Sequence, residues 1–348
     1  MTSVKIDELS YSSPIRSLNT ELKISLIVPC FNEESVVESF YERVTTVLGH
    51  VSYGYEIIFV NDGSRDSTLN VLMEISKFDS NVKVIDLSRN FGHQIAVSAG
   101  IEHSTGDLIV LIDADLQDPP ELIIQFIDKW HEGYDVVYAV RKHRQGESWF
   151  KKWTANKFYR VINRLSEVDI PLDTGDFRLM TREVVNQLVS MKERHRFIRG
   201  MVAWVGFKQI GIEYDRDKRF SGETKYNLRK MQKFAYDGIT SFSTKPLTFA
   251  TGFGFFVALI GFLAMIFIIV MKFMFKNNAI QGWSSQVVIL LFVSAIQLVI
   301  LGIIGEYIGR IYDEVRNRPL YVVKAKYNFN EQSDFYKSNY DQINERLR

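Results

Sequence analysis

The stretch LIVLIDADLQDPP, residues 108–120, joins an apolar strand to a cluster of acidic residues. Its apolar half, Leu108 to Ile112, is typical of a buried strand. Three aspartates follow, Asp113, Asp115 and Asp118, with Gln117 among them, and two prolines then open the next helix. A core strand that ends in alternating carboxylates predicts a site at the edge of a sheet.

Strand and helix patterns alternate along the chain on both sides of this stretch. Apolar runs predict strands at residues 23–29, 55–62, 82–88, 107–113 and 134–140. Helical spacing predicts helices at residues 35–48, 66–78, 94–104 and 119–129, with Ser35 and Asp66 as N-caps of the first two. This alternation implies an α/β fold, in which helices cover both faces of a mostly parallel sheet.

Four of the predicted strands end in polar loops. They read PCFNEE (29–34), NDGSRDS (61–67), SRNFG (88–92) and DADLQDPP (113–120). In open α/β sheets, ligands bind beyond the carboxyl ends of the strands. The four loops therefore predict one ligand pocket. His93, directly after SRNFG, has two open interpretations, a contact to a nucleotide or a simple helix start.

Charge and cysteine content exclude some classes of protein. The 348 residues carry 42 basic and 41 acidic side chains, a formal charge of +1 that gives no general attraction to nucleic acid. A single cysteine, Cys30, excludes an internal disulfide framework. It ends an apolar run, so packing is favoured over a nucleophilic role. Residues 1–22 are mostly polar, without the apolar region of a signal peptide, and are expected to form a flexible arm.

Two long apolar runs, Phe249 to Val270 and Val287 to Ile304, lie near the C-terminus. Two buried core helices could account for them, but a soluble domain rarely buries such helices on all faces, so we predict two membrane spans. Lysines and arginines are more frequent outside this pair of runs than between them, which places both termini in the cytoplasm. Glu306 lies at the inner end of the second run and needs a partner there; Arg310, one turn later, is the expected one.

Asp113 and Asp115 alternate on an extended segment, so their side chains share a face. Two carboxylates on one face repel each other unless a cation lies between them, and hard oxygen ligands suit Mg²⁺ or Mn²⁺. A solvated turn with capping aspartates remains the alternative. The sequence has no G-x-G-x-x-G after its first strand, no P-loop, no zinc spacing and no G-x-S-x-G elbow.

The motifs VPCFNEE, VNDGSRDS, RNFGH, TGDLIVLIDADLQDPP, TGDFRLM and LGEYIGRIY occur here in this order. Together they resemble family 2 glycosyltransferases of the polyprenyl-phosphate type, which include dolichyl-phosphate mannose synthases. The resemblance is strongest to the bacterial bactoprenol (undecaprenyl) phosphate glucosyltransferases, and it runs from about Lys23 to Pro319. It implies a GT-A catalytic domain at 23–227, an interfacial helix at 228–246, two transmembrane helices at 247–310 and a cytoplasmic tail at 311–348.

The resemblance also implies roles for individual residues. The metal ligands would be Asp113, Asp115 and Gln117, and the catalytic residues Asp115, Asp176 beside the sugar and Arg178 beside the phosphates. The donor would be bound by Pro29, Asn32, Glu33, Asp62, Gly92 and Asp113, with Asp62 accepting from a base N–H. The acceptor and its phosphate would be bound by Arg141, Lys151, Lys152, Arg219, Ser221, Thr224 and Lys225.

The acceptor residues lie in two basic segments. RKHRQGESWFKKWTANKFYR (141–160) interleaves basic and aromatic side chains, as does KRFSGETKYNLRK (218–230) more sparsely. The first segment is compatible with a solvated amphipathic helix or with nucleic-acid binding. The two predicted spans favour a position at the lipid headgroups instead.

These observations predict a membrane-anchored, inverting transferase on the cytoplasmic face of the plasma (inner) membrane. The resemblance implies that it moves a hexose, glucose from UDP-glucose in the first instance, to polyprenyl phosphate for modification of envelope glycans. Mannose, an amino sugar or an aminoarabinose derivative, and GDP in place of UDP, remain alternatives, as does a non-catalytic scaffold that binds nucleotide-sugar or lipid. The attacking phosphate oxygen is already ionised near neutral pH, so Asp176 is expected to orient the reactants more than to remove a proton.

The partners predicted from the sequence are the UDP-sugar, polyprenyl phosphate and membrane lipids, with no nucleic acid. No Q-x-x-R-W precedes the spans, so polymer synthesis is not expected, and the product would need a separate flippase and a downstream transferase. A homo-oligomer is expected, and the stretch YVVKAKYNF (321–329) could add a strand to a neighbouring chain.

Overall fold

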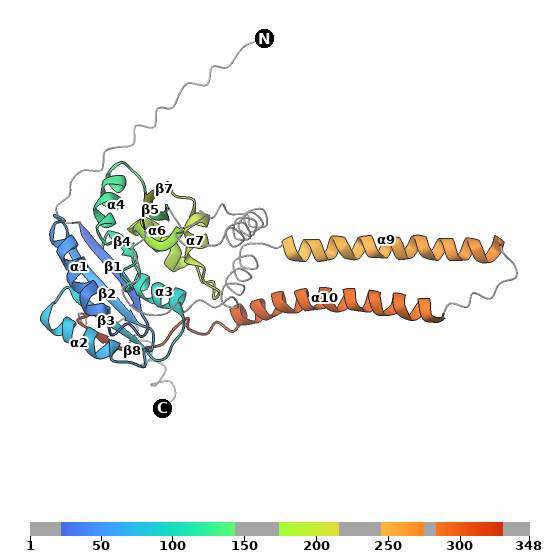
Figure 1. Cartoon of the computed structure of the whole chain (residues 1–348), viewed down its shortest axis with the longest axis horizontal. Coiled ribbons are helices and arrows are strands. Elements are labelled where there is room, and N and C mark those ends of the chain that lie inside the picture. Colours follow the sequence, from blue (N-terminus) through green and yellow to red (C-terminus); the bar gives the residue numbers. More distant parts are fainter. Residues whose placement is uncertain (1–21, 143–173, 216–244, 275–282, 330–348) are drawn as a thin grey trace, which may run out of the picture.

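The computed structural model describes residues 22–142, 174–215, 245–274 and 283–329. Most of them form one α/β domain around an eight-stranded sheet with the strand order β7-β5-β6-β4-β1-β2-β3-β8. Two long helices extend away from this domain, side by side (Figure 1). The described part of the chain therefore has the predicted α/β class and the predicted helical extension.

The elements have the following bounds. The strands are β1 Lys23–Cys30, β2 Gly54–Asn61, β3 Val82–Leu87, β4 Leu108–Leu111, β5 Val136–Arg141, β6 Thr174–Thr181, β7 Gln209–Tyr214 and β8 Val323–Tyr327. The helices are α1 Val37–Gly49, α2 Thr68–Phe78, α3 His93–His103, α4 Leu122–His131, α6 Arg182–Ser190, α7 Ile198–Val205, α9 Lys245–Met274 and α10 Trp283–Val315.

The sheet is mostly parallel, as predicted. Strand β1 pairs in parallel with β2 and β4, β2 pairs with β3, and β5 pairs with β7 in the same way. Strand β6 is antiparallel to both β4 and β5, and β8 is antiparallel to β3. The carboxyl ends of β1, β2, β3 and β4 consequently meet at one edge, where the four polar loops lie.

Helices cover both faces of this sheet, and alternate side chains of β1 show why. Leu26 and Val28 pack in the cluster that contains α1, α2 and α4, whereas Ile27 packs against α3, α6 and α7. Helix α3 approaches β1 so closely that a Cβ at Gly100 would lie 2.3 Å from the Ile27 side chain. A strand with no exposed face reads as a nearly continuous apolar run, and residues 24–28 are such a run, interrupted only by the buried Ser25.

The predicted helix starts need correction. Helix α1 begins at Val37 with Val36 at its N-cap position and no side-chain cap there, so the prediction for Ser35 is wrong. The backbone N–H groups of Val36 and Val37 donate to the Glu33 carbonyl, at 3.0 and 3.1 Å, and this turn sets the start of the helix. Asp66 precedes the N-cap residue of α2, yet its carboxylate accepts the Thr68 backbone N–H at 3.1 Å and so still serves the first turn.

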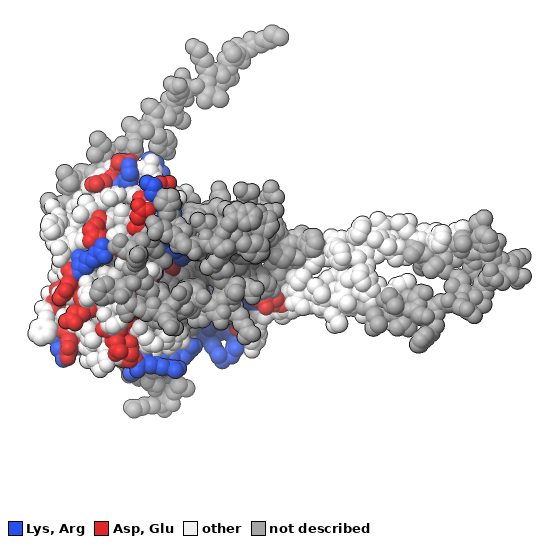
Figure 2. All heavy atoms as spheres, viewed as in Figure 1, with Lys and Arg blue, Asp and Glu red and all other residues white. Residues whose placement is uncertain are grey.

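Helices α9 and α10 carry the two predicted spans. Within the described residues, one stretch, Phe292–Val315, is long and apolar enough to cross a membrane, with a mean hydropathy of 1.8; Ala250–Leu263 is a shorter apolar stretch. Large side chains such as Phe255 (75% exposed) and Leu298 (69%) face outward from the pair, and Figure 2 shows the described helix surfaces as largely uncharged. The crossing by two spans stays a prediction.

The predicted ion pair on α10 is present. The Arg310 Nε donates to Glu306 Oε1 at 3.2 Å, one turn away on the same helix. The pair supplies each charge with a partner at a position where the surrounding residues are apolar.

The strand expected within residues 321–329 forms, but it does not add to a neighbouring chain in this structure. Strand β8 pairs with β3 of its own chain, with Val84 opposite Tyr327 and Asp86 opposite Ala325. The segment after α10 is long enough to return to this edge, where Ser88 N–H donates to the Val322 carbonyl at 2.9 Å. An edge that would otherwise be open is thereby covered within the chain. The homo-oligomer stays a prediction.

Candidate active site

The first two polar loops interlock at the carboxyl edge. Asn32 has a φ of 56°, and its side-chain carbonyl accepts the Arg65 N–H at 2.8 Å while its own N–H donates to the Ser64 hydroxyl at 3.0 Å. Glu33 N–H donates to Thr68 Oγ1 at 2.8 Å. Pro29, on β1 opposite Val60, lies at the base of the same pair of loops. Three predicted donor-binding residues, Pro29, Asn32 and Glu33, thus lie together. Strand pairing and hydrogen bonds from backbone N–H groups to side chains hold them in place.

Asp62 joins these loops to the loop after β3. Its side chain is buried, with the residue 3% exposed, and its two oxygens accept the N–H groups of Phe91 at 2.7 Å and Gly92 at 3.0 Å. Burial raises the pKa of Asp62, and the two N–H groups only partly offset this. Gly92 has a φ of 103° and forms the N-cap of α3. The structure therefore gives Asp62 a loop-fixing role, and its contact to a base stays a prediction.

The acidic turn after β4 has the geometry that its alternation predicts. Asp113, Asp115 and Gln117 are half-exposed, whereas the residues between them are buried. Leu116, with a φ of 57°, turns the chain, and Asp115 Oδ1 accepts the Gln117 N–H at 3.2 Å. One face of the turn thus presents two carboxylates and one amide to the edge of the sheet.

The electrostatics of this turn favour a cation. Burial raises the pKa of Asp113 to about 6, with further upward contributions from the charges of Asp176, Asp118 and Asp115 and opposition from His93. Within the described ranges, no group of three or more His, Cys, Asp and Glu side chains is arranged to hold a metal ion. Two carboxylates and an amide carbonyl nevertheless match the few protein ligands with which Mg²⁺ is usually bound alongside water and phosphate oxygens. The donor set fits the predicted ion.

Asp176 lies beside this turn, in the middle of a network of charged groups. It is on β6, and its side chain is 8% exposed. Its Oδ1 accepts from Arg199 Nε at 2.7 Å, and its Oδ2 accepts from His93 Nε2 at 2.9 Å and Gln94 Nε2 at 3.1 Å. Burial raises the pKa of Asp176, but the charges and hydrogen bonds of Arg199 and His93 outweigh it and hold the pKa well below its usual range. Asp176 is consequently an ionised carboxylate and a weak base.

His93 connects the two carboxylates. Its Nε2 lies 2.9 Å from Asp176 Oδ2 and 3.7 Å from Asp113 Oδ1. Burial lowers the pKa of His93, but the charges of Asp113 and Asp176 raise it to about 9. Near neutral pH the imidazole is therefore cationic and joins the acidic turn to Asp176. Helix α3 also starts at His93, so the helix-start interpretation is confirmed, and a contact to a nucleotide stays a prediction.

Arg178 lies beneath Asp176 and is buried, with 3% of the residue exposed. Its guanidinium donates to the carbonyls of Gly175 at 3.1 Å and Asp176 at 3.3 Å. Burial lowers the pKa of Arg178 to about 10, opposed by the charge of Asp176, so it stays protonated near neutral pH. It supports the backbone of β6, and its contact to donor phosphates stays a prediction.

Arg141, at the end of β5, is the described member of the predicted acceptor set. Its Nε lies 3.5 Å from the Tyr214 hydroxyl, and its Nη2 would lie 3.1 Å from a Cβ at Gly175. The Tyr214 hydroxyl donates to Asp118, and burial together with that carboxylate raises the pKa of Tyr214. The remaining members, Lys151, Lys152, Arg219, Ser221, Thr224 and Lys225, lie outside the described residues.

The alternative of capping aspartates includes Asp118, just before the next helix, and for this residue it is wrong. Helix α4 begins at Leu122 with Glu121 at its N-cap position and no side-chain cap. Asp118 is instead 1% exposed and accepts from Tyr214 on β7. Asp118 belongs to the buried set of alternate residues in the acidic turn, with Ala114 and Leu116.

Sequence reasoning did not assign His93, Gln94, Arg199 and Tyr214 to the site. His93 and Gln94 directly follow the RNFG motif, which was a usable signal. Arg199 lies in HRFIRG, outside the motifs that carry the family resemblance. Its bond to Asp176 depends on how α7 packs against the sheet, and no local pattern encodes that.

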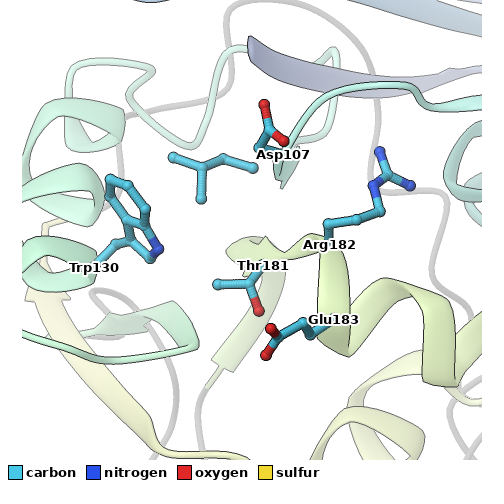
Figure 3. Close-up of a pocket in the computed structure, with 6 residues that line it drawn as sticks. Asp107, Trp130, Thr181, Arg182 and Glu183 are labelled. Atoms are coloured by element: carbon cyan, nitrogen blue, oxygen red, sulfur yellow. The ribbon is translucent and has the colours of Figure 1, made fainter. Parts of the chain in front are cut away.

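A separate open pocket of about 190 Å³ lies at the opposite edge of the sheet. Its lining is Asp107, Leu108, Trp130, Thr181, Arg182 and Glu183, which Figure 3 shows around it. Leu108 begins β4 and Thr181 ends the antiparallel β6, so the pocket belongs to the amino end of the parallel strands. None of the predicted site residues line it, and it lies apart from the acidic turn.

Comparison with known proteins agrees with this geometry. The family model described as Glycosyl transferase family 2 matches residues 25–189. The uncharacterized glycosyltransferase YkcC of Bacillus subtilis is 53% identical over 310 residues, 89% of this chain and 96% of that protein. The SfII prophage-derived bactoprenol glucosyl transferase of Shigella flexneri is 42% identical over 309 residues, 89% of this chain and 100% of that protein. A prophage bactoprenol glucosyl transferase homolog of Escherichia coli K12 is 43% identical over 303 residues, 87% of this chain and 99% of that protein.

The mostly parallel sheet with its acidic turn and the family match define an enzyme of the transferase class with a GT-A domain. Within that class, the chain belongs to glycosyltransferase family 2, among the polyprenyl-phosphate glucosyltransferases. The resemblance drawn from the motifs is thereby confirmed.

Proposed function

We propose that the chain transfers glucose from UDP-glucose to polyprenyl phosphate at the cytoplasmic face of a membrane, in the presence of Mg²⁺ or Mn²⁺. One observation carries the proposal. The half-exposed face of Asp113, Asp115 and Gln117 lies beside the charged network of Asp176. Relatives of similar length whose names describe bactoprenol glucosyl transfer support the choice of sugar and lipid.

The metal would be held by Asp113, Asp115 and Gln117. When bound, it would supply positive charge that stabilises the departing nucleoside diphosphate. His93, cationic and 3.7 Å from Asp113, adds a fixed positive charge at the same turn. The loops that contain Asn32 and Asp62 would hold the nucleoside part of the donor.

The acceptor side needs orientation more than a base. The phosphate oxygen of the lipid is ionised near neutral pH, and Asp176 is held ionised by Arg199 and His93. Both of its oxygens accept hydrogen bonds, so the carboxylate would fix the geometry at the sugar while Arg141 attracts the phosphate. A direct displacement at the anomeric carbon by that oxygen would invert its configuration.

Membrane attachment would be made by α10 together with α9. The apolar stretch Phe292–Val315 and the outward-facing aromatic and aliphatic side chains support this part of the proposal. Basic residues beyond the two runs favour a cytoplasmic position for the catalytic domain. The interfacial role of residues 228–246, the flippase, the downstream transferase and the homo-oligomer belong to the same proposal.

The test uses the full-length purified chain in vesicles. We expect release of UDP and formation of a glucosylated lipid, detected by mass spectrometry, when UDP-glucose, Mg²⁺ and undecaprenyl phosphate are all present. A panel that also contains UDP-linked amino sugars, an aminoarabinose donor and GDP-mannose measures the preference for sugar and nucleotide. Product from another donor alone would correct the sugar. Donor binding without any lipid-linked product across the panel would contradict the transferase proposal and favour a binding scaffold.

A further inference from the structure

The carboxyl-terminal end of α10 contacts the catalytic domain at residues 194–195. Glu314 Oε1 accepts the backbone N–H of Arg194 at 2.7 Å. The Arg194 guanidinium in turn donates to the Arg318 carbonyl at 2.7 Å, just beyond the helix. His195 Nε2 lies 3.8 Å from Asp313 Oδ2. Two neighbouring residues of the catalytic domain are thus held by the end of the long apolar helix.

The same segment leads directly to the charged network of Asp176. Four residues after His195, Arg199 donates to Asp176 Oδ1 at 2.7 Å. The Ile198 N–H donates to Gln94 Oε1 at 2.9 Å, and the Nε2 of the same amide donates to Asp176 Oδ2 at 3.1 Å. Residues 194–199 therefore contact α10 at one end and determine two of the bonds to Asp176 at the other.

Hydrogen bonds and packing hold residues 194–199 in place between α10 and Asp176. Arg196 donates to the carbonyls of Leu188, at 3.2 Å, and Met191, which ties the segment to the end of α6. Ile198, the first residue of α7, is 1% exposed in the core cluster on that face of the sheet. Between its contact with α10 and its contact with Asp176, the segment is therefore bonded to the end of α6 and packed in the core.

We propose that residues 194–199 act as a positioning bridge between α10 and the Asp176 carboxylate, with Glu314 as the positioning residue at the helix end. This inference rests on the proposed function, in which Asp176 fixes the geometry at the sugar and the acceptor arrives from the membrane. Through this bridge, the orientation of the Asp176 carboxylate depends on the position of α10 against the catalytic domain. The donor loops at Asn32 and Asp62 take no part in the bridge, so their hold on the nucleoside part of the donor, which is expected to dominate donor affinity, is independent of it.

A double-mutant cycle in the full-length protein tests the bridge. Glu314→Ala is expected to lower kcat for transfer to undecaprenyl phosphate by about tenfold, because small misplacements of a positioning group reduce rates on that scale or more. The KM for UDP-glucose is expected to stay at the parent value. Arg199→Lys is expected to lower kcat further. The double variant is expected to match Arg199→Lys alone, because the two residues act through the same bond.

Two controls separate positioning from general destabilisation. Lys324→Met removes a contact of the same C-terminal region with the domain, the 3.4 Å ion pair to Asp86, without touching residues 194–199, and is expected to keep parental kcat. Glu314→Gln retains a neutral acceptor for the Arg194 N–H and is expected to recover most of the rate lost in Glu314→Ala. The thermal midpoint of each variant checks that it is folded.

Additive effects of Glu314→Ala and Arg199→Lys, or an unchanged kcat in Glu314→Ala, would overturn the bridge. So would a parallel rise in the KM for UDP-glucose, since the donor loops are outside it. If the parent protein itself formed no lipid-linked product, the proposed function would fail instead. Parental activity combined with an additive cycle would leave the proposed function intact and remove only the bridge.

Discussion

The two edges of the sheet treat their carboxylates in opposite ways. At the amino edge, Glu56 is 1% exposed and is surrounded by donors. It accepts hydrogen bonds from Lys23 Nζ at 2.8 Å, Lys83 Nζ at 2.7 Å and Ser25 Oγ at 2.6 Å. At the carboxyl edge, Asp113 adjoins other acids, and one imidazole lies between it and Asp176. One edge neutralises its acid within the chain, and the other leaves negative charge facing outward.

The pKa values express this difference. Burial raises the pKa of Glu56, but the hydrogen bonds from Lys23, Lys83 and Ser25 outweigh it and lower the pKa to about 2. Burial and neighbouring acids raise the pKa of Asp113 to about 6. Charges that are paired within the protein stabilise the fold. Charges without such partners are typical of functional sites, where a bound ligand neutralises them. The amino edge is therefore expected to determine stability and the carboxyl edge to determine activity.

The largest effect is expected from Asp115→Asn at the carboxyl edge. Loss of one negative ligand weakens metal binding and the stabilisation of departing charge, so transfer is expected to fall by about a thousandfold or more. Release of UDP measures the rate, and circular dichroism measures the fold, which is expected to be unchanged. Asp128→Asn, an exposed aspartate on α4, serves as the control and is expected to keep parental activity. An unaffected rate in Asp115→Asn would contradict the metal assignment.

Glu56→Gln is expected to have the complementary effect. It leaves two lysines without their shared carboxylate in a buried cluster, and it is expected to lower the free energy of unfolding by about 3 kcal/mol. Urea denaturation in detergent measures this, with activity per folded molecule expected to be unchanged. Glu132→Gln breaks an exposed pair with Lys129 and is expected to leave the urea midpoint in place. A loss of activity in Glu56→Gln without a loss of stability would contradict the expectation that the amino edge determines stability and the carboxyl edge activity.

The pH dependence of stability sharpens the same comparison. Glu56 has a folded pKa of about 2, below its ordinary value of 4.5, so its contribution is present above pH 4.5 and is lost as the pH falls toward 2. A depression of this size corresponds to about 3 kcal/mol at neutral pH. The difference in unfolding free energy between the parent and Glu56→Gln is therefore expected to narrow from pH 7 to pH 3. A gap that stays constant over this interval would show that the Glu56 charge is not its source.

The sequence predicted the acidic turn well because its information is local. Asp113, Asp115 and Gln117 are the half-exposed residues of the stretch, as the alternation predicts, although β4 ends at Leu111 and they lie in a turn and not on the expected extended segment. The bonds that hold Asp176 could not be predicted in this way. They join residues 83 apart in the chain in the case of His93, and they depend on how α7 packs for Arg199.

Strand β6 shows a second limit of local patterns. TGDFRLMT contains an aspartate and an arginine, yet all eight residues are buried, because the strand lies between β4 and β5 and is covered on both faces. A strand of this kind has no polar face to alternate with, so it was recognised as a motif and not as a strand. The strand within residues 321–329 was expected, but its partner was misassigned because sequence does not say which edge is open.

The smallest of the expected effects comes from Tyr214→Phe, which is expected to change both stability and activity. The substitution removes a hydroxyl that donates to buried Asp118 and contacts Arg141, so it combines structural and acceptor-side roles. A lost hydrogen bond to a charged group is expected to lower the unfolding free energy by about 2 kcal/mol. Because Arg141 loses a contact, the KM for polyprenyl phosphate is expected to rise while the KM for the donor stays unchanged. Tyr134→Phe is the matched control. The Lys208 Nζ lies 4.3 Å from the centre of the Tyr134 ring, and the substitution removes a hydroxyl but keeps that ring. A rise in both KM values would place Tyr214 in the general architecture of the site, whereas a rise for the acceptor alone would assign Arg141 to the lipid phosphate.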